Sequence, residues 1–193
     1  MEVKHLIVNT IRTKRLMLRK MDKCDANSLF AIWSNPKVTK YMNIEGFTRI
    51  NEAEEMIAFL SDLSERGEAI RYSIFKKNSN TIIGSCGFNS LNFEAKSAEI
   101  GYDLDSQFWN KGYGTEAVNG LVDYAFHQLN LKIIEAKVDP RNILSIKLLQ
   151  KLNFELQGIV EENEGQADDL YLYTKGSHIQ KSSNGWIVPS QKG

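Results

Sequence analysis

The sequence predicts one mixed α/β domain, and the order of its elements is the basis for that prediction. Three strand-like segments follow one another between residues 70 and 104, as in an antiparallel meander. A long amphipathic helix then leads into another strand, which is typical of a parallel β-α-β unit. No internal repeat or linker divides the chain. We therefore expect a single domain over residues 1–176 and a C-terminal tail, 177–193, that packs back or is partly disordered.

Each element is predicted from its apolar period and from the residues that end it. Asn35-Pro36 ends an early helix, since proline disfavours helical geometry in the residue before it, and Gly67 is a plausible C-cap. Gly84 and Gly87 mark a bulge or a close backbone approach. The predicted strands are 14–20, 70–76, 81–89, 97–104, 133–138, 154–160 and 170–174. The predicted helices are 26–34, 50–66, 115–129 and 144–152, and residues 37–42 form a short helix or a turn.

Composition narrows the possible functions. The chain carries 24 Lys plus Arg and 24 Asp plus Glu, which argues against nucleic-acid binding driven by bulk charge. No apolar run approaches the ~18 residues of a membrane span, and the N-terminus does not read as a signal peptide. Two separated cysteines, Cys24 and Cys86, and three scattered histidines form no metal-ligand pattern. We expect a cytoplasmic protein, monomer or homodimer, without metal, nucleic-acid or membrane partners.

Residues 99–126 hold the most informative chemistry. A strand breaks in a polar turn that contains Gly112 and Gly114, and an amphipathic helix follows. Glycine permits positive φ and close approach, and backbone N–H groups at a helix start stabilise anionic oxygens. The turn lacks both the lysine of a Walker loop and the third glycine of a dinucleotide fingerprint. The spacing by itself therefore supports a tight turn or a generic anion site.

Two longer runs, AEIGYDLDSQFWNKGYGTEAVNGLVDYAF and IEAKVDPRNILSIKLLQKLNFELQG, resemble the GNAT acetyltransferase superfamily, and most of all its RimJ/RimL-like N-acetyltransferases. The opening TKRLMLRKMDKCDANSLFAIWSNPKVTKYM is similar to the start of that branch, so the resemblance covers roughly residues 10–175. It implies a GNAT fold: a mostly antiparallel central sheet, splayed at the cofactor strand, with helices on both faces. It also implies transfer of acetyl from acetyl-CoA to a primary amine.

The resemblance further implies where coenzyme A binds. The backbone at Tyr102, Asp103 and Leu104 would face the pantetheine arm. Backbone N–H groups of the glycine turn would cradle the pyrophosphate, with Lys111 adding charge, and two side chains of a later helix would reach the coenzyme. The residues are Asn110, Lys111, Gly112, Tyr113, Gly114 and Thr115 in the turn, and Asn142 and Ser145 on the helix.

The catalytic groups are less well defined by the resemblance. Many members carry a tyrosine that protonates the departing thiolate, but Leu149 stands at that position here. We therefore expect the proton to come from Ser145 or from a water molecule. Glu99, on the strand before the turn, is the candidate base that takes a proton from the amine, and a paired or solvent-facing strand residue is the equal alternative.

The acceptor site is the least constrained part of the prediction. Trp33, Tyr41 and Phe47 would shape it or belong to the core, Ser85 or Cys86 could line it, and the acidic turn 161–169 would attract an amine or simply be solvated. A protein N-terminus is the first expectation for the acceptor and a small amine the second. A non-catalytic acyl-CoA-binding or sensing module is the alternative from a different class.

Overall fold

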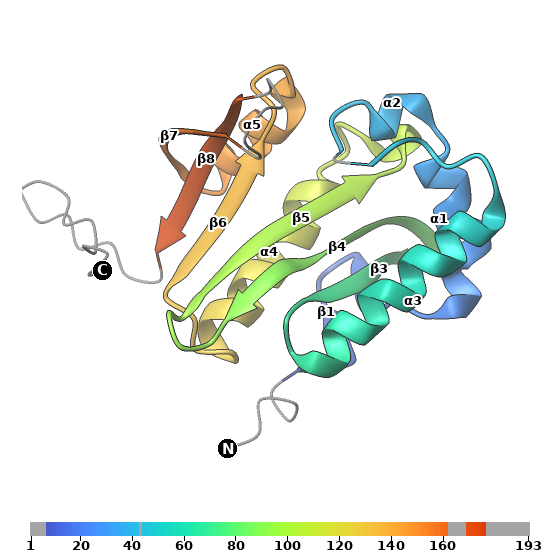
Figure 1. Cartoon of the computed structure of the whole chain (residues 1–193), viewed down its shortest axis with the longest axis horizontal. Coiled ribbons are helices and arrows are strands. Elements are labelled where there is room, and N and C mark those ends of the chain that lie inside the picture. The colour runs from blue at the N-terminus through green and yellow to red at the C-terminus, as the bar shows by residue number, and fades with distance from the viewer. Residues whose placement is uncertain (1–6, 43, 162–168, 177–193) are drawn as a thin grey trace, which may run out of the picture.

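An eight-stranded sheet runs through the molecule in the order β1-β2-β3-β4-β5-β6-β8-β7 (Figure 1). The computed structural model describes residues 7–42, 44–161 and 169–176. Only β5 and β6 pair in parallel, and the other neighbours are antiparallel. The strands are β1 Thr10–Arg12, β2 Leu16–Lys20, β3 Ile70–Lys76, β4 Thr81–Asn92, β5 Ser97–Leu104, β6 Ile133–Val138, β7 Glu155–Glu161 and β8 Asp169–Gly176.

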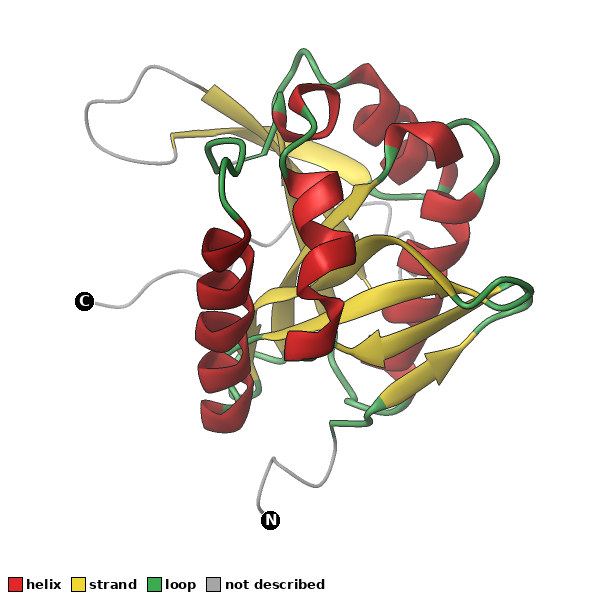
Figure 2. Cartoon of the chain, turned by 90° about the vertical axis from the view of Figure 1, so that its right-hand side faces the viewer, coloured by secondary structure: helices red, strands yellow, loops and turns green. Residues whose placement is uncertain are grey.

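Helices cover both faces of this sheet, as expected (Figures 1 and 2). The helices are α1 Ala26–Trp33, α2 Pro36–Thr39, α3 Ile50–Arg66, α4 Tyr113–His127 and α5 Ile143–Lys151. One core lies between the sheet and α4 and α5, and a second, smaller one includes apolar residues of α1 and α3. Within the described residues, no helix has the length and apolar character that a membrane span requires.

Most elements lie where the sequence predicts them, and the differences have local causes. The strands 70–76, 97–104 and 133–138 are confirmed. The strand expected at 14–20 is confirmed as β2 but begins at Leu16, because the chain turns after Arg12 to pair β2 with a short strand, β1, that the sequence did not predict. Helix α4 begins two residues before the expected Thr115, because Gly112 in the left-handed region serves as its N-cap. The acidic residues 162–168 and the tail 177–193 lie outside the described residues, so those expectations stay predictions.

The sheet opens between its two parallel strands. β5 pairs with β6 only over Ser97–Glu99, although β5 continues to Leu104 and β6 to Val138. On its other edge β5 stays paired with β4 as far as Leu104. The backbone of β5 beyond Glu99 therefore presents one edge that has no strand beside it, and this is the splay that the resemblance implies.

Gly84 and Gly87 lie where neighbouring backbones come very close in the middle of the sheet. A Cβ at Gly84 would lie 2.9 Å from the Cα of Leu104, and one at Gly87 would lie 2.8 Å from the Cα of Arg71. The pairing of β3 with β4 shifts beside Gly84, between the partners of Ile74 and Phe75. Both expectations for these glycines, a bulge and a close backbone approach, are confirmed.

Replacement of Gly87 by alanine should destabilise the protein. The added methyl group meets backbone atoms of β3, which cannot rotate away, so we expect Gly87→Ala to lower the free energy of unfolding by about 1–3 kcal/mol. Denaturant unfolding monitored by circular dichroism measures this change. Gly158→Ala is the matched control, because nothing lies within 4 Å of a Cβ at Gly158. Equal midpoints for the two variants would contradict the argument.

Candidate active site

The glycine turn, residues 110–115, places the start of α4 beside a cavity. Asn110 and Gly112 both have positive φ, 58° and 75°, and Gly112 is the N-cap of the helix. The first hydrogen bond within α4 is donated by the Glu116 N–H to the Gly112 carbonyl, at 3.1 Å. The N–H groups of Tyr113, Gly114 and Thr115 therefore have no partner inside the helix, and they lie at the positive end of its dipole.

A cavity of about 560 Å³, here called the turn cavity, lies beside this turn. Its walls combine the end of β5, the turn itself and the exposed face of α5. Four cationic residues line it, and the two on α5 are four positions apart and so share one face. The cations are Lys37, Arg141, Lys147 and Lys151, and the turn contributes Asn110, Gly112, Gly114 and Thr115. The arrangement suits a ligand that carries several phosphates.

The start of α4 is fixed to the β1–β2 turn by Glu116. Its carboxylate accepts hydrogen bonds from the Thr13 hydroxyl (2.7 Å), the Arg15 backbone N–H (2.6 Å) and the Arg15 guanidinium (2.6 Å). Arg15 also donates to the Lys111 carbonyl at 3.0 Å. Burial opposes ionisation of Glu116, but the hydrogen bonds from Arg15 and Thr13 outweigh it and lower the pKa of this carboxyl group.

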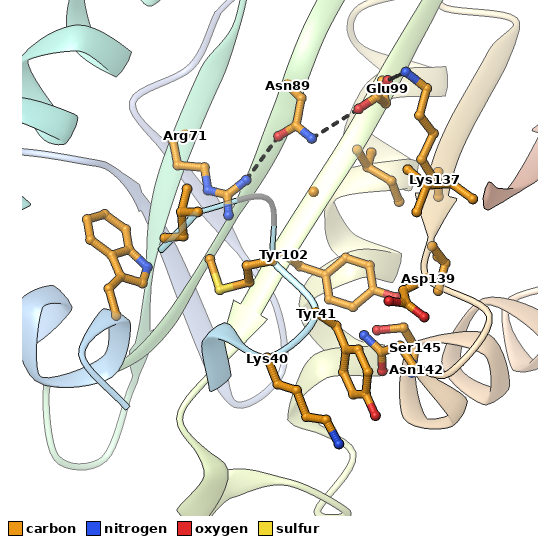
Figure 3. Close-up of a pocket in the computed structure, with 18 of the residues that line it drawn as sticks. Lys40, Tyr41, Arg71, Asn89, Glu99, Tyr102, Lys137, Asp139, Asn142 and Ser145 are labelled. Carbon is orange, nitrogen blue, oxygen red and sulfur yellow. Dashed lines mark hydrogen bonds and ion pairs between the residues drawn. The ribbon is translucent and has the colours of Figure 1, made fainter. Parts of the chain in front are cut away.

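A second cavity of about 440 Å³, here called the strand cavity, lies further along β5 (Figure 3). Trp33, Met42, Met56 and Leu60 contribute apolar walls. Across it runs a series of polar contacts that joins three strands: the Glu99 carboxylate accepts from Asn89 Nδ2 at 3.2 Å and from Lys137 Nζ at 2.9 Å. The strand cavity therefore combines a carboxylate with an apolar surface, which suits an amine that carries an apolar group.

The two cavities meet beside Tyr102. Six residues line both of them: Tyr41, Met42, Tyr102, Arg141, Asn142 and Ser145. Asn142 is the N-cap of α5, and its Oδ1 accepts the Ser145 N–H at 3.2 Å, so its Nδ2 is the part of the amide that can donate to a ligand. The Tyr102 hydroxyl is buried beside Ser145, and burial raises its pKa to about 12 although the contact with Ser145 opposes the shift.

Not every residue expected at the coenzyme site faces a cavity. Lys111 donates to the Gln107 carbonyl at 2.8 Å, and the Tyr113 ring lies against the Arg15 guanidinium, 4.3 Å from its Cζ. Neither residue lines the turn cavity. Asp103 lines the turn cavity, but its carboxylate is buried and accepts hydrogen bonds from Arg71 and Ser85, so only its backbone faces the open edge of β5. Leu149 is fully buried in the core and lines neither cavity.

Some of the residues expected at the acceptor site line the strand cavity, and others are buried away from it. Trp33 and Tyr41 line the strand cavity, whereas Phe47 packs edge-on against Trp33 and does not. Ser85 is buried, and its backbone N–H donates a hydrogen bond to the Asp103 carboxylate. Cys86 is fully buried, which raises the pKa of its thiol to about 12. Sequence reasoning missed Arg71 and Asn89, which no local pattern marks, and it missed Lys147 and Lys151, whose spacing of four residues on a predicted helix was available.

Comparisons with known proteins identify the family and the fold of the chain. The family model described as an acetyltransferase (GNAT) domain matches residues 15–155. An uncharacterized N-acetyltransferase, p20, from Bacillus licheniformis is 48% identical over 170 residues, 86% of this chain and 96% of that protein. The spermidine N(1)-acetyltransferase of Vibrio cholerae is 26% identical over 150 residues, 77% of this chain and 84% of that protein. The solved complex of coenzyme A with RimL, a ribosomal L7/L12 alpha-N-protein acetyltransferase, superposes with a TM-score of 0.78 at 23% identity, covering 86% of this chain and 97% of that one.

Loss of the Glu116 carboxylate should weaken folding in a pH-dependent way. Its folded pKa lies below the ordinary value of 4.5, so its stabilisation is complete above pH 4.5 and is lost as pH falls through the folded value. We expect Glu116→Gln to cost about 1–2 kcal/mol of unfolding free energy at pH 7, and the difference from the native protein to shrink below pH 4.5. Urea titrations across pH 3–7 measure it, with Glu54→Gln on the exposed face of α3 as control. A difference that is constant with pH would contradict the assignment.

The lysines of α5 should contribute to coenzyme affinity through charge. We expect the double variant Lys147→Ala/Lys151→Ala to bind coenzyme A about tenfold more weakly at low ionic strength, because two cations lining the turn cavity are removed. The loss should decrease in 0.5 M salt, which screens exposed charges. Isothermal titration calorimetry at both salt concentrations tests this. Lys23→Ala/Lys132→Ala, which changes two exposed lysines outside both cavities, should leave the affinity unchanged.

Proposed function

The chain belongs to the GNAT family of acetyl-CoA-dependent acetyltransferases, and we propose that it transfers acetyl to a primary amine by direct attack on the thioester. The observation that carries this proposal is the junction of the two cavities on β5. A ligand with several phosphates suits the turn cavity, an amine suits the strand cavity, and both reach Tyr102 and Ser145. In this proposal the acetyl group passes from one ligand to the other at that junction.

The coenzyme is proposed to bind mainly through backbone groups. Tyr102, Asp103 and Leu104 lie beyond the last residue of β5 that pairs with β6, so their free edge would pair with the pantetheine arm. The N–H groups of Tyr113, Gly114 and Thr115, together with Asn110 and Gly112, would hold the pyrophosphate. The amide of Asn142 would donate to the coenzyme from the start of α5. Lys111 would act through its backbone only, since its ammonium group is bound to Gln107.

In the proposed reaction, the neutral amine nitrogen attacks the thioester carbonyl carbon, the new C–N bond forms and the C–S bond breaks. Glu99 takes the proton that the amine must lose, directly or through water. Ser145 is the proposed proton donor to the departing thiolate, because its side chain lies at the junction and Leu149 cannot supply a proton. Water then reprotonates the Ser145 hydroxyl, and Glu99 returns the proton of the amine to water. Neither Cys24 nor Cys86 lines the turn cavity or the strand cavity, which supports transfer without a covalent enzyme intermediate.

A protein N-terminus is our first proposal for the acceptor, and a small amine is the second. One structural neighbour is named as an alpha-N-protein acetyltransferase, and one relative as a spermidine acetyltransferase. The apolar wall of the strand cavity favours an acceptor with an apolar group next to its amine. A free polyamine carries several positive charges, and the described part of that cavity contains the cations Lys40 and Arg71, which repel them.

A non-catalytic acyl-CoA-binding module is the alternative that one observation favours. Both oxygens of Glu99 already accept hydrogen bonds, and the tyrosine expected for thiolate protonation is replaced by the buried Leu149. In such a module the turn cavity would bind the coenzyme, and no amine would be acetylated.

An acetylation screen decides between the two functions. Purified protein is given acetyl-CoA and a panel of N-terminal peptides, polyamines, amino acid derivatives and aminoglycosides, and thiol release is followed. We expect turnover with at least one amine, and Glu99→Gln should lower kcat about 10²–10⁴-fold and remove the acidic limb of the pH–rate profile. Tight coenzyme binding without turnover on any amine would support the binding module. An unchanged kcat and pH profile in Glu99→Gln would exclude Glu99 as the base.

A further inference from the structure

Asn89 occupies an irregular position in β4, opposite Glu99. The register pairs Phe88 with Ile100 and Ser90 with Glu99, so Asn89 is the extra residue of a β-bulge. A bulge changes the direction of one side chain while the strands on both sides continue. Here it places Asn89 where it contacts Arg71 of β3 and Glu99 of β5 at the same time (Figure 3).

Arg71 fixes which way the Asn89 amide faces. Its Nε donates to Ser85 Oγ at 3.0 Å and its Nη2 to Asp103 Oδ2 at 2.9 Å, and its side chain is only 13% exposed. Its Nη1 donates to Asn89 Oδ1 at 3.1 Å. A guanidinium group has no acceptor, so the amide must present its oxygen to Arg71. The Nδ2 group is then the part that faces Glu99, 3.2 Å from its Oε1.

The two side chains that contact the Glu99 carboxylate, Lys137 and Asn89, differ in how well their own positions are fixed. Lys137 Nζ lies 2.9 Å from the other oxygen, but that side chain is 36% exposed and ends a flexible stem. Glu135, the register partner of Glu99 on β6, is the other charged residue adjacent on the neighbouring strand. Asn89, in contrast, is held by an arginine that is itself anchored at two points. Gly101 leaves room for this arrangement, since a Cβ there would lie 2.5 Å from Asn89 Oδ1 and 2.9 Å from Arg71 Nη1.

We propose that Asn89 and Arg71 are positioning residues that hold the Glu99 carboxylate in place to accept the proton of the amine. The inference rests on the proposed role of Glu99 as base. Asn89 donates to one carboxylate oxygen and so restricts rotation of the side chain, and Arg71 restricts Asn89. Arg71 does not contact Glu99 and acts on it only through the amide.

The test replaces the donor by an acceptor of the same shape. Asn89→Asp keeps an oxygen for Arg71 but removes the donor and places a negative charge beside Glu99, which disfavours ionisation of its carboxylate. We expect the acidic limb of the kcat/KM profile to move up by about one pH unit, kcat to fall about tenfold and KM for acetyl-CoA to stay within twofold. Asn92→Asp is the matched control on the same strand, because its Oδ1 accepts the Ala95 N–H at 2.8 Å and its Nδ2 donates to no other described residue.

A direct titration keeps the inference testable even if no amine is turned over. Protein labelled with ¹³C at the glutamate carboxyl carbon is titrated by NMR, and the Glu99 signal is identified by its loss in Glu99→Gln. The midpoint of that signal should rise by about one pH unit in Asn89→Asp and stay unchanged in Asn92→Asp. Gly101→Ala, which displaces Asn89 without changing a polar group, should also shift the midpoint. An unshifted Glu99 midpoint in Asn89→Asp would overturn the inference.

The outcomes separate this inference from the proposed function. If Glu99→Gln removes the acidic limb and Asn89→Asp leaves it in place, Glu99 remains the base and the positioning role is wrong. If Asn89→Asp shifts the NMR midpoint but Glu99→Gln does not alter catalysis, the contacts orient the carboxylate and its role as base is wrong.

Discussion

The separation of β5 from β6 after Glu99 is the constraint on which the rest of the site depends. Three residues of parallel pairing hold the strands together, and beyond them β5 keeps only β4 as its neighbour. Unpaired backbone groups of a buried strand need partners, and a ligand with amide groups of its own can supply them. Both cavities open along this segment, and they meet at Tyr102, three residues past the last pair. A fully paired β5 would leave no place for this junction.

Side chains alternate along β5, so its two faces carry different parts of the site. Ile100 packs into the core beneath α4, and Tyr102 faces the junction beside α5. Glu99, Gly101 and Asp103 point to the other face, where Glu99 meets Asn89 and Asp103 meets Arg71. The backbone of Asp103 thus lies at the proposed coenzyme edge, while its carboxylate anchors the arginine that orients Asn89. The proposed coenzyme and acceptor sites are therefore connected through a single residue of the strand.

The sequence predicts those features that depend on short segments. Strands 70–76, 97–104 and 133–138 have clear apolar patterns bounded by polar turns, and the glycine turn identifies the start of α4. Thr10–Arg12 escaped prediction because three residues carry no period. Arg71 and Asn89 escaped it because their contact needs a bulge that shifts a register by one residue, between segments 18 positions apart. Lys147 and Lys151 could have been found, since their spacing alone puts them on one face of a helix.

The buried ion pair of Arg71 and Asp103 fixes the orientation of the guanidinium group and contributes little to the free energy of folding. A buried ion pair loses about as much solvation as it gains in attraction, and apolar residues of the same volume often stabilise a fold equally well. Apolar residues could not point a donor at Asn89, however. Ser85 and Asp103 occupy two sides of the guanidinium group and leave Nη1 to face the bulge. The desolvation of these charges therefore results in a fixed position for the Asn89 amide, which donates to the Glu99 carboxylate at the strand cavity.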